Sequence, residues 1–144
     1  MIAIDTNVLL RRILRNDALQ AKKVDALFDK HASILITDVV LVETIWTLCG
    51  KKYGASKEAI AEVVLSLLEE TNLVFENQQA IWSALNDYMS AKPVKTPSGM
   101  KEVDFADALV INKARVMMEQ WGEPYEATYT FDKAAQSIDG VSAL

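Results

Sequence analysis

Short apolar runs alternate with longer segments of helical periodicity along almost the whole chain, and this alternation is the feature that most restricts its fold. Apolar runs predict strands at 2–4, 34–37, 73–75 and 127–131, with an edge strand at 141–144. Apolar residues three and four positions apart predict helices at 8–15, 17–31, 39–49, 56–68, 77–89 and 104–121. Strands joined by helices form βαβ units, so we expect an α/β fold of three layers, α/β/α, with a mostly parallel central sheet.

The length and composition are typical of one globular domain, which we expect to span residues 1–144. The chain has 51% hydrophobic and 24% charged residues. It shows no N-terminal targeting segment and no apolar run of membrane-spanning length, so we expect a soluble, cytoplasmic protein. The net charge of −5 argues against bulk attraction of nucleic acid, although carboxylates that hold divalent cations would carry such a charge.

Nucleophilic catalysis by serine or cysteine is a poor fit to this sequence. The only cysteine, Cys49, lies next to an apolar run, and we expect a reduced, packed thiol. The only histidine, His31, lies in a polar stretch with no evident link to it. Catalysis that needs a histidine base is therefore not indicated.

Acidic residues follow four of the predicted strands. They are Asp5, Asp38, Glu76 and Asp132. In an open α/β sheet, ligands bind outside the carboxyl ends of the strands, so acids at these points are candidates for chemistry. The alternative is helix capping, for which Asp is well suited. Capping is the simplest interpretation of Asp38, and it is also an interpretation of Asp132.

The helix expected from residue 104 carries two further acids. Asp107 lies on the same helical face as Ile111, Ala114, Met118 and Trp121, and that face should point toward the core. An ionised carboxylate there needs compensation. One explanation is structural, with Asp104 as the cap and Asp107 in the first turn of the helix. The other explanation is a cation shared with Asp5 and other acids.

Two further sets of polar residues have both a structural and a functional interpretation. Glu43 lies in the middle of a largely apolar helix, beside Thr44, Thr47 and Lys51. It belongs either to a solvated polar stripe on that helix or to a functional site. Basic residues occur after the first acid and around the segment 92–99, which we expect to be a loop because it contains two prolines and a glycine. One interpretation of these basic residues is a solvated surface, and the other is contact with RNA. The residues are Arg11, Arg12, Arg15, Lys92, Lys95 and Lys101.

Four short motifs occur in a fixed order along the chain. They are Asp5-Thr6-Asn7 after the first strand, Val42-Glu43 within an apolar helix, Asp104-Phe105-Ala106-Asp107-Ala108-Leu109 at the start of a late helix, and Thr130-Phe131-Asp132 after a late strand. In this order they resemble the PIN-domain family, and within it most closely the VapC-type toxins of prokaryotic toxin–antitoxin pairs. The resemblance extends over nearly the whole chain.

The resemblance implies a metal-dependent endoribonuclease that acts on RNA. The acids that match the catalytic, metal-binding positions of the family are Asp5, Glu43, Asp107 and Asp132. Supporting polar positions are matched by Thr6, Asn7, Asp104 and Thr130. The resemblance leaves Asp38 and Glu76 as caps. It further implies an antitoxin protein that occludes the site with a basic side chain, and a homodimer.

The donor chemistry agrees with that implication. Mg²⁺ and Mn²⁺ prefer oxygen ligands, and the matched acids have no His or Cys among them that would indicate zinc. A bound divalent cation makes water acidic enough to attack a phosphodiester. The sequence does not distinguish one ion from two.

Two rival functions remain open. One is a Mg²⁺-dependent phosphatase with Asp5 as nucleophile, although Asn7 stands where that class usually has a second Asp. The other is a PIN-like module that binds without catalysis, which the presence of all four matched acids disfavours.

Overall fold

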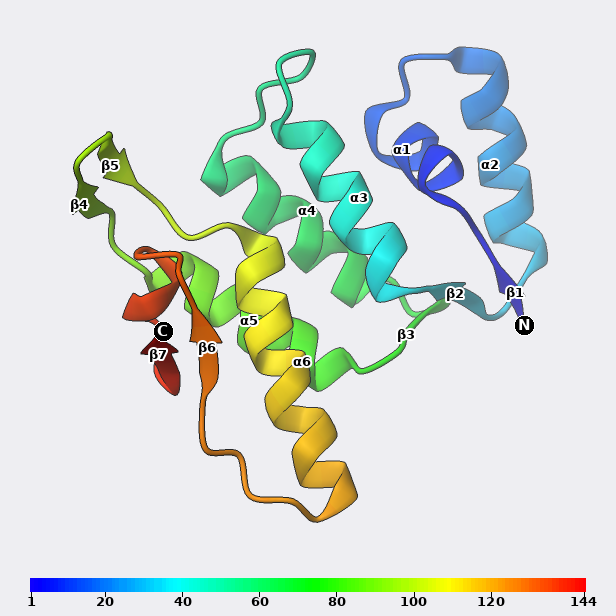
Figure 1. The fold of residues 1–144 in the computed structure, drawn as a ribbon. Helices are drawn as coiled ribbons and strands as arrows, with labels where there is room; N and C mark the ends of the chain where they lie inside the picture. Colours follow the sequence, from blue (N-terminus) through cyan, green and yellow to red (C-terminus); the bar gives the residue numbers. More distant parts are fainter. The chain divides into compact units, whose positions relative to one another are not determined.

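The computed structural model describes all 144 residues, and the chain divides into two compact units, Met1–Gln78 and Gln79–Leu144. Each unit is described by itself (Figure 1). The elements of the first unit are β1 (Ile2–Ala3), α1 (Thr6–Leu14), α2 (Ala18–Lys30), β2 (Ile34–Ile36), α3 (Asp38–Cys49), α4 (Lys57–Glu69) and β3 (Leu73–Phe75). Helix α5 (Gln78–Ser90) starts at the boundary between the units.

The first unit is built on a parallel sheet of three strands in the order β1-β2-β3. The central strand β2 places Ile34 opposite both Ile2 and Leu73. Helix α1 packs against α2 and α3, and α3 packs against α4. The parallel pairing and the alternation of strands with helices confirm the α/β class that the sequence predicts.

The core of the first unit comes from the central strand and the inner faces of its helices. Ile34 and Ile36 are fully buried, as are Leu9 in α1 and Ile60 in α4. Central strands of parallel sheets are rich in such residues because helices cover them. Burying one large aliphatic side chain contributes about 1.5–3 kcal/mol, so this layer supplies much of the stability of the unit.

Polar side chains cap the starts of helices α2, α3 and α4, and the cap of α3 differs from the prediction. Asp17 and Ser56 cap α2 and α4 by accepting hydrogen bonds from the backbone. Helix α3 is capped by Thr37, whose hydroxyl accepts from the Val40 amide. The prediction that Asp38 is the cap is wrong, because the extended backbone of strand β2 continues to Thr37 and Asp38 is already helical.

The second unit contains β4 (Val94–Thr96), β5 (Gly99–Lys101), α6 (Phe105–Trp121), β6 (Thr128–Thr130), a short 3₁₀ helix η1 (Ala135–Ser137) and β7 (Val141–Ala143). Strands β6 and β7 pair in parallel, with Thr128 opposite Val141, as a sheet separate from β1-β2-β3. The fourth strand and the edge strand that the sequence predicts are thus both present, and they pair with each other.

The segment expected to be a loop, 92–99, is largely part of an antiparallel hairpin formed by β4 and β5. Thr96 pairs with Gly99 across the turn, and the Thr96 hydroxyl donates to the Gly99 carbonyl over 2.7 Å. Gly99 has a φ of +116°, a backbone conformation that residues other than glycine rarely adopt. Proline and glycine here mark the hairpin turn rather than an irregular loop.

Two predictions about side-chain burial are also wrong. Cys49 is exposed, because it is the last residue of α3 and lies on the solvent side of its end. Trp121 is 69% exposed at the last position of α6, so the face that starts at Asp107 is buried at Ile111 but opens toward its C-terminal end. No helix in the chain combines the length and the apolar character needed to span a membrane.

Candidate functional site

Asp5 lies at the point where the chain leaves strand β1 and turns into helix α1. Its side chain caps the helix, with Oδ1 accepting from the Val8 amide over 2.9 Å. The residue is exposed, and this bond engages Oδ1 only. The capping interpretation of Asp5 is correct, and capping occupies only one of its two carboxylate oxygens.

Glu43 is tied to this turn by a side-chain hydrogen bond. The Thr6 hydroxyl donates to Glu43 Oε2 over 2.6 Å, joining the first residue of α1 to the middle of α3. A charge-assisted bond of this length restricts the Glu43 carboxylate, which is otherwise solvent-exposed. Thr6 therefore holds the Glu43 carboxylate in place, and it directly follows Asp5 in the sequence.

Asp5 also lines a hollow between helices α1 and α2. Asn7 lines the same pocket, which has a volume of about 460 Å³. Two basic residues, Arg11 and Lys23, complete its charged lining. Lys23 is a residue that the sequence patterns did not single out.

In the second unit, three acids lie near the start of helix α6. Asp104 caps the helix, its Oδ1 accepting from the Ala106 amide over 2.9 Å. Asp107 occupies the first turn and is half-buried. Burial raises the pKa of Asp107, and repulsion from Asp104 and Asp132 raises that pKa further, while Lys101 opposes the shift. The cap and first-turn interpretation holds for both residues.

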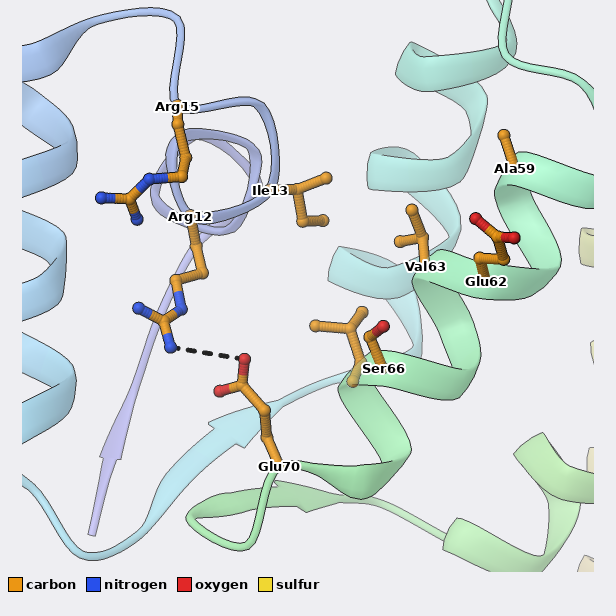
Figure 2. Close-up of a pocket in the computed structure, with 9 residues that line it drawn as sticks. Arg12, Ile13, Arg15, Ala59, Glu62, Val63, Ser66 and Glu70 are labelled. Carbon is orange, nitrogen blue, oxygen red and sulfur yellow. Dashed lines mark hydrogen bonds and ion pairs between the residues drawn. The ribbon is translucent and has the colours of Figure 1, made fainter.

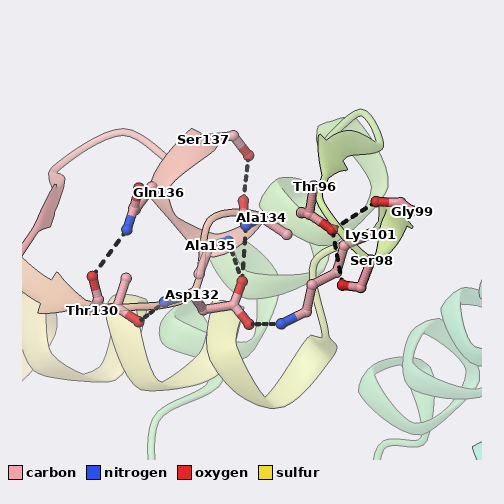
Figure 3. A network of polar contacts seen from close by, with 10 residues as sticks. All are labelled: Thr96, Ser98, Gly99, Lys101, Thr130, Asp132, Ala134, Ala135, Gln136 and Ser137. Carbon is pink, nitrogen blue, oxygen red and sulfur yellow. Dashed lines mark hydrogen bonds and ion pairs between the residues drawn. The ribbon is translucent and has the colours of Figure 1, made fainter.

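Asp132 lies in a network of polar contacts after strand β6 (Figure 3). Its Oδ1 accepts from the amides of Ala134 and Ala135 over 2.8 and 3.0 Å, which is the capping role that the sequence suggests. Its Oδ2 forms an ion pair with Lys101 Nζ at 2.5 Å. The bond from Lys101 lowers the pKa of Asp132, and the same contact raises the pKa of Lys101.

Thr130 supports this arrangement from the end of β6. Its hydroxyl accepts from the Asp132 amide over 3.0 Å, and its carbonyl accepts from the Gln136 side chain over 3.0 Å (Figure 3). These bonds define the turn that presents Asp132. Lys101 comes from strand β5, so the hairpin that the sequence did not predict delivers an ammonium group to the acids.

The structure thus brings the eight residues singled out from sequence together in two groups, one in each unit. Asp5, Thr6, Asn7 and Glu43 belong to the first unit, and Asp104, Asp107, Thr130 and Asp132 belong to the second. Asp38 and Glu76 interact with each other, because the Asp38 amide donates to Glu76 Oε2 over 2.5 Å. Glu76 therefore serves the start of α3.

Two of the arginines proposed as RNA contacts are bound to carboxylates instead. Arg12 pairs with Asp25 at 2.8 Å and with Glu70 at 3.4 Å, and Arg15 pairs with Asp25 at 2.7 Å. Figure 2 shows the Arg12–Glu70 pair beside a pocket of about 600 Å³ between α1 and α4. These ion pairs lower the pKa of Asp25 to about 2, with the Arg15 bond as the largest cause.

The acids of both groups offer oxygen donors to a divalent cation. All the candidate donors are carboxylate oxygens, which Mg²⁺ and Mn²⁺ prefer. The hydrogen bonds of Asp5, Glu43 and Asp104 each engage one carboxylate oxygen. Both oxygens of Asp132 are engaged, one by two backbone amides and the other by Lys101. The structure contains no cluster of three or more acidic, His or Cys side chains arranged to hold a metal ion. The residues present therefore fit a divalent cation by the type of their donor atoms and not by their arrangement.

Strands that alternate with helices and pair in parallel define an α/β protein, and acidic residues lie shortly after several of these strands. The family model of the PIN domain matches residues 2–122, and the chain belongs to the PIN-domain family, a family of nucleases. That range contains Asp5, Glu43, Asp104 and Asp107, whereas Asp132 lies beyond it.

No curated protein matches the chain. Among solved structures, the chain is similar to the Mycobacterium tuberculosis toxin VapC20, described as cleaving the sarcin–ricin loop, with 16% sequence identity and a TM-score of 0.40. The likeness covers 98% of this chain and 97% of that toxin.

Proposed function

We propose that this protein is a metal-dependent endoribonuclease that hydrolyses RNA phosphodiester bonds. The observation that carries the proposal is the PIN-domain match over residues 2–122, which includes three of the four acids at catalytic positions of the family. The match runs through both compact units, and we take residues 1–144 to act as a single PIN-like domain.

Within this proposal, Asp5, Glu43, Asp107 and Asp132 are the catalytic carboxylates and would hold Mg²⁺ or Mn²⁺. When bound, the cation would lower the pKa of the attacking water and neutralise charge on the phosphate. The supporting residues Thr6 and Thr130 orient Glu43 and the Asp132 turn through the hydrogen bonds described above.

Asn7 and Asp104 are the other supporting residues. Asn7 lines the pocket beside Asp5 and presents an amide to whatever enters it. Asp104 secures the start of α6, the helix that carries Asp107, and it adds negative charge beside that residue. The raised pKa of Asp107 means that this carboxylate gains more than a solvated one from a cation that binds it.

We further propose that the chain is the toxin of a type II toxin–antitoxin pair. The support is the order of its four motifs, which is that of VapC-type toxins. Its partners would be an RNA substrate and an antitoxin protein that inserts a basic side chain among the acids, for which the negative charge is complementary. We also propose that the protein is cytoplasmic and forms a homodimer.

The decisive experiment is cleavage of a mixed pool of structured RNAs by the purified chain. The reactions contain Mg²⁺, Mn²⁺ or EDTA, and the variants are Asp5→Asn and Asp107→Asn, with Glu76→Gln as the matched acid outside the site. Cleavage should need metal. Each site variant should lose cleavage activity by at least about 10–100-fold, because changes to residues that only support metal ligands already cost that much. Glu76→Gln should cleave like the unaltered protein.

Other outcomes would reject the proposal. Equal cleavage in every sample would show a contaminating nuclease. Turnover of phosphate monoesters without RNA cleavage would favour a phosphatase that uses Asp5. Absence of any hydrolysis by metal-loaded protein would leave a PIN-like binding module.

A further inference from the structure

The pocket beside Asp5 has more basic than acidic residues in its lining, although the protein as a whole is acidic. Helices α1 and α2 form it, and its lining comprises Asp5, Asn7, Val8, Arg11, Gln20, Lys23 and Val24. Two side chains of this lining are basic and one is acidic, in a chain with net charge −5. Its volume of about 460 Å³ lies within the range of pockets that hold small ligands, about 300–1,000 Å³.

Arg11 keeps its positive charge unneutralised. Its Nη1 donates to Asn16 Oδ1 over 2.8 Å, and its Nε donates to Gln20 Oε1, so both partners are neutral amides. The neighbouring arginines Arg12 and Arg15 are instead paired with carboxylates. An arginine held in place by neutral partners is suited to binding an anion, because its guanidinium is oriented and its charge is still available.

Lys23 adds a second positive charge from helix α2. It is exposed and forms no ion pair with a carboxylate. Gln20 uses its oxygen to hold Arg11, so its NH₂ group remains a donor. The pocket therefore combines two cations and amide donors with a single carboxylate, and that carboxylate is Asp5.

From this arrangement we infer that the pocket between α1 and α2 holds one backbone phosphate of the RNA, next to the bond that Asp5 helps to cleave. Arg11 and Lys23 contact this phosphate. The inference rests on the proposed nuclease function and adds to it two residues that bind the substrate.

The test measures binding separately from cleavage. The full chain in EDTA is titrated into a fluorescently labelled, 2′-O-methyl single-stranded RNA of mixed sequence over a series of salt concentrations. The variants are Lys23→Gln and Arg11→Gln, and the control is Lys22→Gln, the exposed lysine adjacent to Lys23 that does not line the pocket. Lys23→Gln carries the test, since Arg11 also joins α1 to α2 and its loss can disturb folding.

Lys23→Gln should weaken binding and reduce the slope of log K against log salt by about 0.7, the value for one lost phosphate contact on a single strand. Lys22→Gln should leave that slope unchanged.

Equal affinity and slope in the Lys22 and Lys23 variants would overturn the inference, as would the absence of any RNA binding. These outcomes are distinct from failure of the nuclease proposal. A chain that cleaves RNA with equal slopes in both variants would keep the nuclease and reject the pocket. A chain that shows the slope change without cleavage would keep the pocket and reject the nuclease.

Discussion

At the scale of single residues, the acids of this protein have both a structural and a proposed catalytic role. Asp5 and Asp104 each cap a helix with one oxygen. Asp107 differs, because burial and two neighbouring acids raise its pKa. A half-buried carboxylate beside other acids destabilises the folded chain when it is ionised. Functional sites commonly lower the stability of a protein in this way.

Replacing Asp107 with Asn should therefore stabilise the metal-free protein at pH 7. The pKa of Asp107 is raised in the folded state, so the stability that its neutral form provides is present at low pH and is lost as pH rises through the folded-state pKa. The gain at pH 7 should stay below about 1 kcal/mol because water screens a half-exposed group.

Thermal unfolding of the protein and the Asp107→Asn variant in EDTA, from pH 3 to 8, measures this gain. The difference in Tm should be positive at pH 7 and should shrink as the pH falls toward the ordinary range of an Asp carboxyl. A lower Tm for the variant at pH 7 would mean that the carboxylate is stabilising instead.

Asp25 should show the opposite dependence on pH. Its pKa falls from 3.8 to about 2 in the folded state, because Arg15 and Arg12 stabilise the ionised form. The contribution is fully present above pH 3.8 and is lost as the pH falls through about 2. Asp25→Asn should therefore unfold more readily than the unaltered protein at pH 7, and the difference should be much smaller at pH 2, as followed by circular dichroism. Asp29→Asn, on the same helix and outside these ion pairs, should differ little at either pH.

At the scale of elements, helix α3 links the core to the site. One face carries Leu41 and Ile45 into the interior, while Glu43 on another face accepts the bond from Thr6. The helix is nevertheless exposed at Val39 and Trp46, so its apolar sequence does not make it buried on all sides.

Leu41→Ala should destabilise the protein by about 2–5 kcal/mol, because the side chain is 1% exposed and its removal leaves a cavity. Leu19→Ala provides the matched comparison. Leu19 is 68% exposed in α2, so its loss should change stability by no more than about 0.5 kcal/mol. Urea unfolding measures both, and similar values for the two variants would show that α3 is not packed as described.

At the scale of the whole molecule, binding of a divalent cation should appear as added stability. A ligand that binds only the folded state stabilises it by about 2.7 kcal/mol at a concentration 100 times its Kd. Under the proposed function, Mn²⁺ should raise the Tm of the unaltered protein in a concentration-dependent way and raise it much less in Asp5→Asn. Equal shifts in both proteins, or none in either, would argue against Asp5 as a metal ligand.

The sequence alone was sufficient to predict the main helices and strands of the fold, but not the hairpin formed by β4 and β5. Apolar periodicity located the strands and helices to within a few residues, because it follows directly from which side chains must leave water. It also identified the polar positions at strand and helix ends, such as Asp5, Ser56 and Asp104, since capping is a local interaction between residues two or three apart. Membership of the PIN-domain family was evident from the same local motifs and is confirmed.

Contacts between residues far apart in the sequence were decided only by the tertiary structure. Lys101 meets Asp132, Thr6 meets Glu43, and Arg12 meets Glu70, and none of these pairs has a sequence spacing that predicts it. The same holds for the pocket in which Arg11 and Lys23 lie with Asp5. Local patterns show which side chains are charged, but only packing of helix against helix decides which charges are neutralised and which remain available to bind a substrate.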